Sequence, residues 1–144
     1  MEDESVTWET CTLRKWLNGD FLNAAFSAEE QVRLETVTVT ADKNPKYDTD
    51  PGNDTQDKVF LLSIDEVNRY FASDDARVCM PTKTAVANGA YTNAAGTCWW
   101  WLRSPGYGTI NAADVKRDGS VYGSGSYVDS GRGGVRPVVA LRLS

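Results

Sequence analysis

Apolar residues near the N-terminus recur at the spacing of an α-helix. Those within 13–17 fall on one helical face, Thr10 or Thr12 can cap the helix, and Asn18-Gly19 is a signal for its end. A second short apolar turn follows over 20–26. The pattern therefore predicts a short N-terminal helix and a further helical turn.

Two serines mark the starts of further helices. Ser27 with Glu30 and Ser63 with Glu66 have the spacing of a capping box, in which the serine and the acidic side chain satisfy each other's backbone N–H groups. Between the two boxes, apolar and polar residues alternate over 32–39, which predicts a β-strand.

Three strongly apolar segments predict further strands. They cover 59–62, the tryptophan-rich 99–102 and 135–143. Pro137 has no N–H to donate, so it favours an edge position or a bulge near the start of the last strand. Residues 73–97 follow no clear periodicity and are expected to be irregular.

The stretch between the last two predicted strands, Gly106–Gly133, is rich in Gly, Ser, Tyr, Asp and Asn, and holds seven of the 12 glycines. Asp118-Gly119 is a hairpin signal between Val115 and Val121. Gly125 predicts a further turn. We expect a small meander whose few apolar residues point inward while the others face solvent.

Composition limits the class of protein. A chain of 144 residues with 41% hydrophobic and 24% charged residues matches one globular domain. No apolar run approaches the roughly 18 residues of a membrane span, and the acidic Met1–Ser5 is unlike the start of a secretory signal. A net charge of −5 argues against binding to duplex nucleic acid.

The chain contains no histidine. Ser–His–Asp and Cys–His catalysis, imidazole metal sites and histidine pH switches are therefore excluded for this chain by itself. Cys11, Cys79 and Cys98 are far apart in sequence, which indicates either reduced thiols or one bridge plus a spare thiol. No neighbouring residue marks any of them as an activated thiolate.

The acidic loop over 41–57 has a binding and a structural interpretation. Its oxygen-bearing side chains, Asp48, Asp50, Asn53 and Asp54, could collect around calcium. An EF-hand, however, needs glycine at its sixth position and glutamate at its twelfth, and neither is present. We favour a solvated loop.

The aromatic and basic residues next to Gly106–Gly133 are similarly ambiguous. Trp99–Trp101 could form a platform for sugars or bases, but neighbours on a strand alternate faces, so at least one ring should be in the core. Arg103 and Arg136 could bind an anion. We favour a structural role in which each joins backbone carbonyls or carboxylates.

The composition of Gly106–Gly133 is typical of a binding surface. Tyr107, Tyr122 and Tyr127 offer rigid contact area, while Ser, Gly, Asp and Asn offer adaptable hydrogen bonds, as in antibody loops.

Motifs along nearly the whole chain resemble one family. In the C-terminal half they are Trp100–Gly106, Ala112-Ala113-x-Val115, Asp118-Gly119-x-Val121, Gly125, Val128 and Gly134–Pro137; earlier ones are Trp8-Glu9, Leu13–Asn18, Phe21-Leu22, Ala25–Ser27 and Thr55–Ser63. They resemble a family of domains of unknown function, DUF6273-like, related to the formylglycine-generating-enzyme branch of the C-type lectin fold.

Many members with this ending resemble the variable proteins of diversity-generating retroelements of phages and other mobile elements. There a reverse transcriptase miscopies template adenines, and AAC or AAT codons reach Asn, Tyr, Ser, Asp, Gly, Ile, Arg and others, but not Lys, Glu, Gln, Met or Trp. Lys116 lies outside this set and is either a fixed position or an argument against the scheme. The resemblance implies these ligand-binding, hypervariable positions: Tyr107, Gly108, Ile110, Asn111, Asp114, Arg117, Ser120, Tyr122, Gly123, Ser124, Ser126, Tyr127, Asp129, Ser130, Gly131 and Arg132.

Two departures narrow the implied function. The reactive cysteine pair of the formylglycine-generating enzymes is missing after Cys98, and the calcium motifs of sugar-binding lectins are absent. We therefore expect a non-catalytic, monomeric ligand-binding protein without metal or other cofactor. A formylglycine-generating-enzyme-like oxidase and a fixed-specificity lectin or adhesin are the alternatives.

The expected architecture is a single α+β domain over 1–144 with the C-type lectin fold, in which N-terminal helices pack on a small twisted antiparallel sheet and the termini meet. The variable region covers about 106–133, and its partner is a protein or cell-surface ligand, not nucleic acid or the membrane interior. Location stays open between the cytoplasm, a virion and display through a partner.

Overall fold

The computed structural model describes residues 5–143, where the helical segments are short. No helix in this part of the chain is long and apolar enough to cross a membrane. The helical segments are α1 (Thr12–Trp16), the π-helical turn η1 (Leu17–Phe21), α2 (Leu22–Ala25), α3 (Ala28–Arg33), α4 (Ile64–Tyr70), α5 (Asp74–Arg77) and α6 (Lys83–Ala87).

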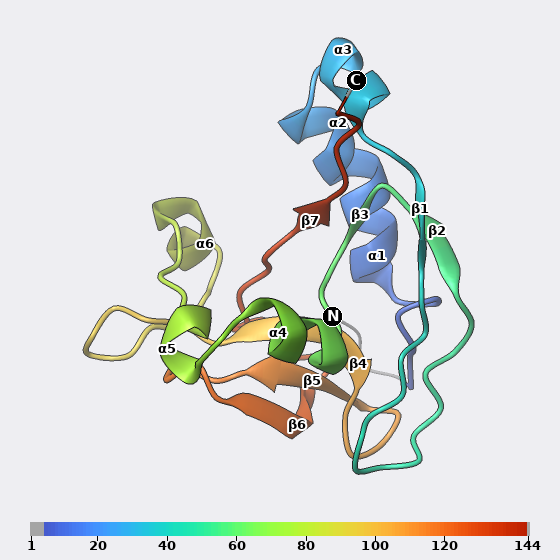
Figure 1. The fold of residues 1–144 in the computed structure, drawn as a ribbon. Coiled ribbons are helices and arrows are strands. Elements are labelled where there is room, and N and C mark those ends of the chain that lie inside the picture. The colour runs from blue at the N-terminus through green and yellow to red at the C-terminus, as the bar shows by residue number, and fades with distance from the viewer. Residues whose placement is uncertain (1–4, 144) are drawn as a thin grey trace.

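The strands described form small antiparallel sheets of two or three strands (Figure 1). Helices and antiparallel strands in one chain confirm the α+β class. The pairs are β1 (Val37–Val39) with β2 (Thr55–Asp57), and β3 (Val59–Phe60) with β7 (Val138–Val139); β4 (Trp100–Pro105), β5 (Asn111–Val115) and β6 (Val121–Tyr127) form a sheet in that order.

Both predicted capping boxes are confirmed. Ser27 and Glu30 open α3, and Ser63 and Glu66 open α4, each pair with both reciprocal hydrogen bonds. The N-cap of α1 is neither of the two threonines predicted but Cys11, whose sulfur accepts from the backbone N–H of Arg14, the third residue of the helix.

The prediction that the first helix ends at Asn18-Gly19 is wrong, because the chain continues through η1 into α2. The Asn18 side chain forms hydrogen bonds with a distant segment of the chain. Its Nδ2 donates to the Val59 carbonyl at 2.8 Å, and its Oδ1 accepts from the N–H groups of Lys58 and Val59, each at 2.9 Å. Asn18 therefore joins the helical run to β3 instead of ending it.

Two predicted strands are much shorter than the alternation suggested. Of 32–39 only β1 is a strand, because α3 runs to Arg33 and includes Val32, which is 71% exposed. Of 135–143 only β7 is a strand, and it begins directly after Pro137. Leu34 and Leu141, one from each segment, still meet in an isolated antiparallel bridge.

The hairpin predicted at Asp118-Gly119 is confirmed, with Val115 paired to Val121 and Gly119 at φ +87°. Gly125, in contrast, is not a turn. It lies within β6 at φ +79°, beside a register shift in the β5–β6 pairing, and a Cβ there would lie 2.2 Å from the Ala112 carbonyl oxygen. Gly125 is therefore part of a β-bulge in β6.

The tryptophan-rich strand β4 is buried along its whole length. Trp100 belongs to the cluster that joins α4 to the sheet, whereas Trp101 belongs to the cluster that includes Leu17 and Leu22 of the N-terminal helices. The sequence left open which of the neighbouring tryptophans faces the core. Both Trp100 and Trp101 do, because each face of β4 packs against a hydrophobic cluster.

The expectation that the termini meet is wrong for the residues described. The Val6 N–H donates to the Thr109 carbonyl beside the three-stranded sheet, whereas the Arg142 N–H donates to the Arg33 carbonyl at the end of α3. These two places lie at different ends of the molecule (Figure 1).

Candidate functional site

Two adjoining open hollows lie on one face of the β5–β6 hairpin, and we call this area the hairpin face. Their volumes are about 430 and 620 Å³, and Trp99, Tyr122, Ser126 and Ser130 line both. The first hollow is also lined by Tyr91, Asp114, Lys116, Arg117 and Arg132; the second is also lined by Tyr107, Asn111, Ser124, Gly125, Tyr127 and Asp129.

The alternation of side chains along the hairpin creates this face. Ala113 and Val115 are fully buried in the cluster that contains α4. Asp114, between them, points to the opposite side of the sheet and lines the first hollow together with Tyr122, its cross-strand partner. Small buried residues thus anchor the hairpin while polar and aromatic ones face the hollows.

The predicted 41–57 loop ends in strand β2, and its earlier residues support the edge of the hairpin face, so the prediction of a solvated loop is wrong for these residues. The Asn44 side chain is buried, and its Nδ2 donates to the carbonyls of Pro105 at 2.9 Å and Gly123 at 2.7 Å. Thr49 Oγ1 donates to the Gly106 carbonyl at 2.8 Å. These bonds hold the backbone next to Tyr107 and Ser124, which line the second hollow.

Cationic and aromatic groups are paired at the first hollow. Lys116 Nζ lies 4.4 Å from the centre of the Tyr122 ring, and the Arg117 guanidinium carbon lies 5.0 Å from the centre of the Tyr91 ring. Such contacts stabilise each pair by about 0.5–1 kcal/mol at exposed sites and hold the flat rings in place.

Asp114 forms the floor of the first hollow and is 2% exposed. The expectation that all candidate side chains face solvent is therefore wrong at this position. Ser126 Oγ donates to Asp114 Oδ2 at 2.8 Å. Burial raises the pKa of Asp114 from 3.8 to about 6, and the Ser126 hydrogen bond opposes the rise only in part.

The structure brings most of the sequence-predicted positions together at the hollows. Those that line them are Tyr107, Asn111, Asp114, Arg117, Tyr122, Ser124, Ser126, Tyr127, Asp129, Ser130 and Arg132. Those that do not are Gly108, Ile110, Ser120, Gly123 and Gly131. Ser120 instead bonds to Asp118 in the hairpin turn.

Some residues that line the first hollow were not identified from the sequence. Tyr91 comes from 73–97, where the expectation of an irregular segment is wrong because α5 and α6 lie there. Its N–H donates to the Arg132 carbonyl at 3.0 Å. Trp99 and Lys116 line the first hollow as well. Only Trp99 carried a signal, as one of the tryptophans considered for an aromatic platform.

Arg103 has the structural role that was expected. Its guanidinium donates to the carbonyls of Thr40 and Leu61 and pairs with Glu66 and Asp42. These bonds tie α4 and the start of the 41–57 loop to β4.

For Arg136 the corresponding expectation is wrong. Its guanidinium carbon lies 4.6 Å from the centre of the Trp100 ring and 5.7 Å from that of Phe71. Its Nη1 atom is buried without a hydrogen-bond partner. Arg136 therefore contributes by stacking on rings of the core.

The carboxylates considered for calcium are used within the loop. Asp50 Oδ1 accepts from the Gly52 N–H at 2.9 Å, Asp54 Oδ1 from the Ala41 N–H at 2.7 Å, and Asp48 lies 3.7 Å from Lys43 Nζ. Across residues 5–143 there is no group of three or more His, Cys, Asp or Glu side chains suited to a metal ion.

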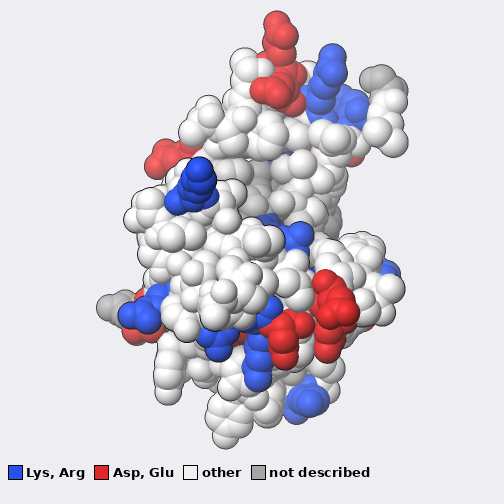
Figure 2. All heavy atoms as spheres, turned by 90° about the vertical axis from the view of Figure 1, so that its left-hand side faces the viewer, with Lys and Arg blue, Asp and Glu red and all other residues white. Residues whose placement is uncertain are grey.

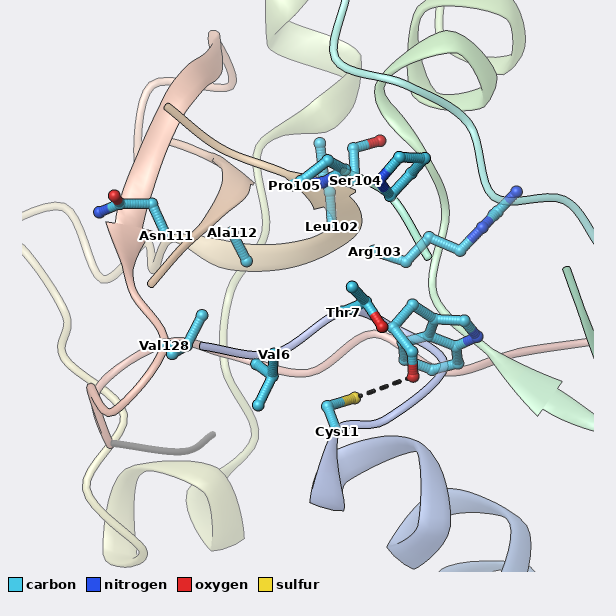
Figure 3. Close-up of a pocket in the computed structure, with 12 residues that line it drawn as sticks. Val6, Thr7, Cys11, Leu102, Arg103, Ser104, Pro105, Asn111, Ala112 and Val128 are labelled. Atoms are coloured by element: carbon cyan, nitrogen blue, oxygen red, sulfur yellow. Dashed lines mark hydrogen bonds between the residues drawn. The ribbon is translucent and has the colours of Figure 1, made fainter. Parts of the chain in front are cut away.

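A small cavity lies elsewhere, between the N-terminal segment and β4–β5 (Figure 3). Val6, Thr7 and Cys11 line one side, and Leu102 and Ala112 line the other. Its volume of about 20 Å³ is close to that of a single water molecule, so it is far too small for an organic ligand.

Charged side chains of both signs are scattered over the face shown in Figure 2, with wide uncharged areas between them. The lysine and arginine side chains on this side of the molecule do not form a continuous basic patch.

Comparison with known proteins gives a family and no activity. No curated protein and no solved structure matches the chain. A family profile described as a domain of unknown function, DUF6273, matches residues 1–143. Because this match covers nearly every residue, the chain belongs to the DUF6273 family.

Proposed function

We propose that this protein is a non-catalytic binding protein whose hairpin face recognises variable protein or cell-surface ligands. The observation that carries the proposal is the gathering of the sequence-predicted positions around two adjoining open hollows. Tyrosine rings, arginines and small hydroxyl side chains meet there, the mixture that binding surfaces use for rigid contact area and adaptable hydrogen bonds.

The separation between framework and surface supports the same proposal. Ala113, Val115 and Val128 are buried, whereas Tyr107 and Tyr127 are 69% and 64% exposed. Exposed substitutions usually change stability by less than about 0.5 kcal/mol. The exposed residues on this face, unlike the buried Asp114 and the sterically confined Gly125, could therefore change from one protein to the next, and with them the partner, while the fold stays the same.

We propose further that a diversity-generating retroelement exchanges these residues. The test is to sequence the DNA beside the gene. The expected finding is a reverse-transcriptase gene and a near-copy of the 3′ end whose differences fall at template adenines. A gene with neither would refute diversification and leave the fixed-specificity adhesin as the remaining binding hypothesis.

A display experiment tests binding capacity without knowledge of the natural ligand. Positions of the hairpin face, among them Tyr107, Tyr122 and Tyr127, are randomised in the displayed full chain, and binders to hen lysozyme are selected. A matched library randomises the exposed Asp65, Asn68 and Arg69 of α4. We expect binders from the first library alone; equal success from both would remove any special role of the hairpin face.

For the fold we propose the C-type lectin type, in its formylglycine-generating-enzyme-like branch. An N-terminal helical run, small antiparallel sheets and a surface carried by late strands support this proposal. The separation of the described chain ends speaks against it. An experimental structure superposed on known C-type lectin domains tests it, and a different strand order would refute it.

A further inference from the structure

Cys79 and Cys98 lie opposite each other across an isolated antiparallel bridge. The Cys98 N–H donates to the Cys79 carbonyl at 2.9 Å. Opposed residues in antiparallel pairs have Cα atoms about 4.5–5.5 Å apart, which lies within the range of about 4.4–6.8 Å that a disulfide requires. The backbone therefore already places the two residues at bridging distance.

The side chains also meet. The pKa of the Cys98 thiol is raised to about 11, mainly by burial and further by the charge of Cys79 and a hydrogen bond with it. Opposed side chains of an antiparallel pair share a face, which agrees with this contact. Cys11 lies elsewhere, at the N-cap of α1, where its sulfur donates to the Trp8 carbonyl at 3.3 Å.

The segment between the two cysteines, 80–97, has few other anchors in the described structure. It carries α6, and none of its residues belongs to either hydrophobic cluster. In Figure 1 it projects from one side of the sheet. Its connection to the hairpin face is Tyr91, which contacts Arg117 and Arg132 at the first hollow.

We propose that Cys79 and Cys98 form an intrachain disulfide that fastens the 80–97 segment, and with it the Tyr91 wall of the first hollow, to the sheet. The oxidant is a low-molecular-weight disulfide such as oxidised glutathione. Cys79, the more exposed thiol, attacks as thiolate, forms a mixed disulfide and releases one glutathione thiolate. Cys98 then attacks the Cys79 sulfur and releases the second.

The overall exchange is balanced. Two protein thiols lose two electrons and two protons and form one S–S bond, while one glutathione disulfide becomes two glutathione thiols. In a reducing compartment the pair stays as thiols, and in an oxidising one it closes.

The test uses the full chain in glutathione buffers of stepped redox potential, followed by alkylation under denaturing conditions and mass spectrometry. In oxidising buffer we expect one alkylated cysteine, Cys11, and a peptide that links Cys79 to Cys98. Closure of a loop of about this length should raise Tm by roughly 5–10 °C. Proteolytic cleavage within 80–97 should become slower.

Two variants make the result specific. Cys79→Ser should abolish the bridge and the gain in Tm. Cys11→Ser should retain both, since serine is itself a good N-cap. Three alkylated cysteines in the most oxidising buffer, a bridge that includes Cys11, or a bridge between two chains would overturn the proposal. Because the readout is thiol chemistry, it does not depend on the hairpin face binding any ligand.

Discussion

The carboxyl group of Asp114 gives the sharpest physical prediction. Burial raises its pKa from 3.8 to about 6, so the folded protein holds this proton more tightly than the unfolded chain does. The charged form therefore costs free energy of folding. The cost is absent below the unfolded pKa, grows between pH 3.8 and about 6, and stays constant at higher pH.

The magnitude follows from the two pKa values. A rise from 3.8 to about 6 corresponds to roughly 3 kcal/mol. Asp114→Asn removes the charge but keeps an oxygen that can accept from Ser126 Oγ. We expect the variant to exceed the wild type in free energy of unfolding by about 3 kcal/mol at pH 8 and by only about 1 kcal/mol at pH 4.5.

Urea unfolding followed by tryptophan fluorescence at the two pH values measures this difference, with equal m values as the check that the unfolded states match. Asp129→Asn is the control, because Asp129 is exposed on the same face and should change stability by less than about 0.5 kcal/mol at either pH. A gain for Asp114→Asn that is the same at both pH values, or a loss at pH 8, would refute burial as the cause.

Three further predictions concern the framework, each read from the free energy of unfolding in urea. Gly125→Ala should lower the free energy of unfolding by about 2–4 kcal/mol, because at this positive φ the new Cβ would lie 2.2 Å from a carbonyl oxygen of β5. Gly131→Ala is the control and should be nearly neutral, because no neighbouring atom lies within 4 Å of its new Cβ; equal effects of the two variants would contradict the bulge. Trp100→Ala should cost about 3–5 kcal/mol, since the ring is 1% exposed; a cost below 1 kcal/mol would show that it does not hold the core. Ser63→Ala should cost about 1–2 kcal/mol and more than Ser27→Ala, because Ser63 is buried and its hydroxyl also donates to a carboxylate at 2.7 Å; the reverse order would contradict this difference.

Local sequence signals were reliable where a few neighbouring residues satisfy one another. Both capping boxes and the Asp118-Gly119 hairpin are present, because their hydrogen bonds close within two to four residues of chain. The alternation over 32–39 gave a wrong prediction, because α3 continues to Arg33 and only Val37–Val39 is a strand. The prediction of a turn at Gly125 is wrong because a bulge and a turn both favour glycine at positive φ.

The amino-acid composition indicated which stretch of chain carries the candidate site, but not how its residues are arranged in space. The positions over 107–132 stand out as a mixture of tyrosine, serine, glycine and aspartate, and most of them line the hollows. Tyr91 joins them from a distant segment, and Asp114 is buried although its neighbours are exposed. Neither fact follows from sequence spacing, because each depends on which segments pack together.

The sequence by itself determined the α+β class, the starts of α3 and α4, the Asp118-Gly119 hairpin and the stretch of chain that carries the candidate surface. It did so because these features follow from short-range hydrogen bonds, periodicity and residue chemistry. The tertiary structure alone decided that β4 is buried on both faces, that Asn44 supports the hairpin face and that Cys79 faces Cys98. Those outcomes depend on contacts between residues far apart in the chain, which the order of residues does not reveal until the core has packed.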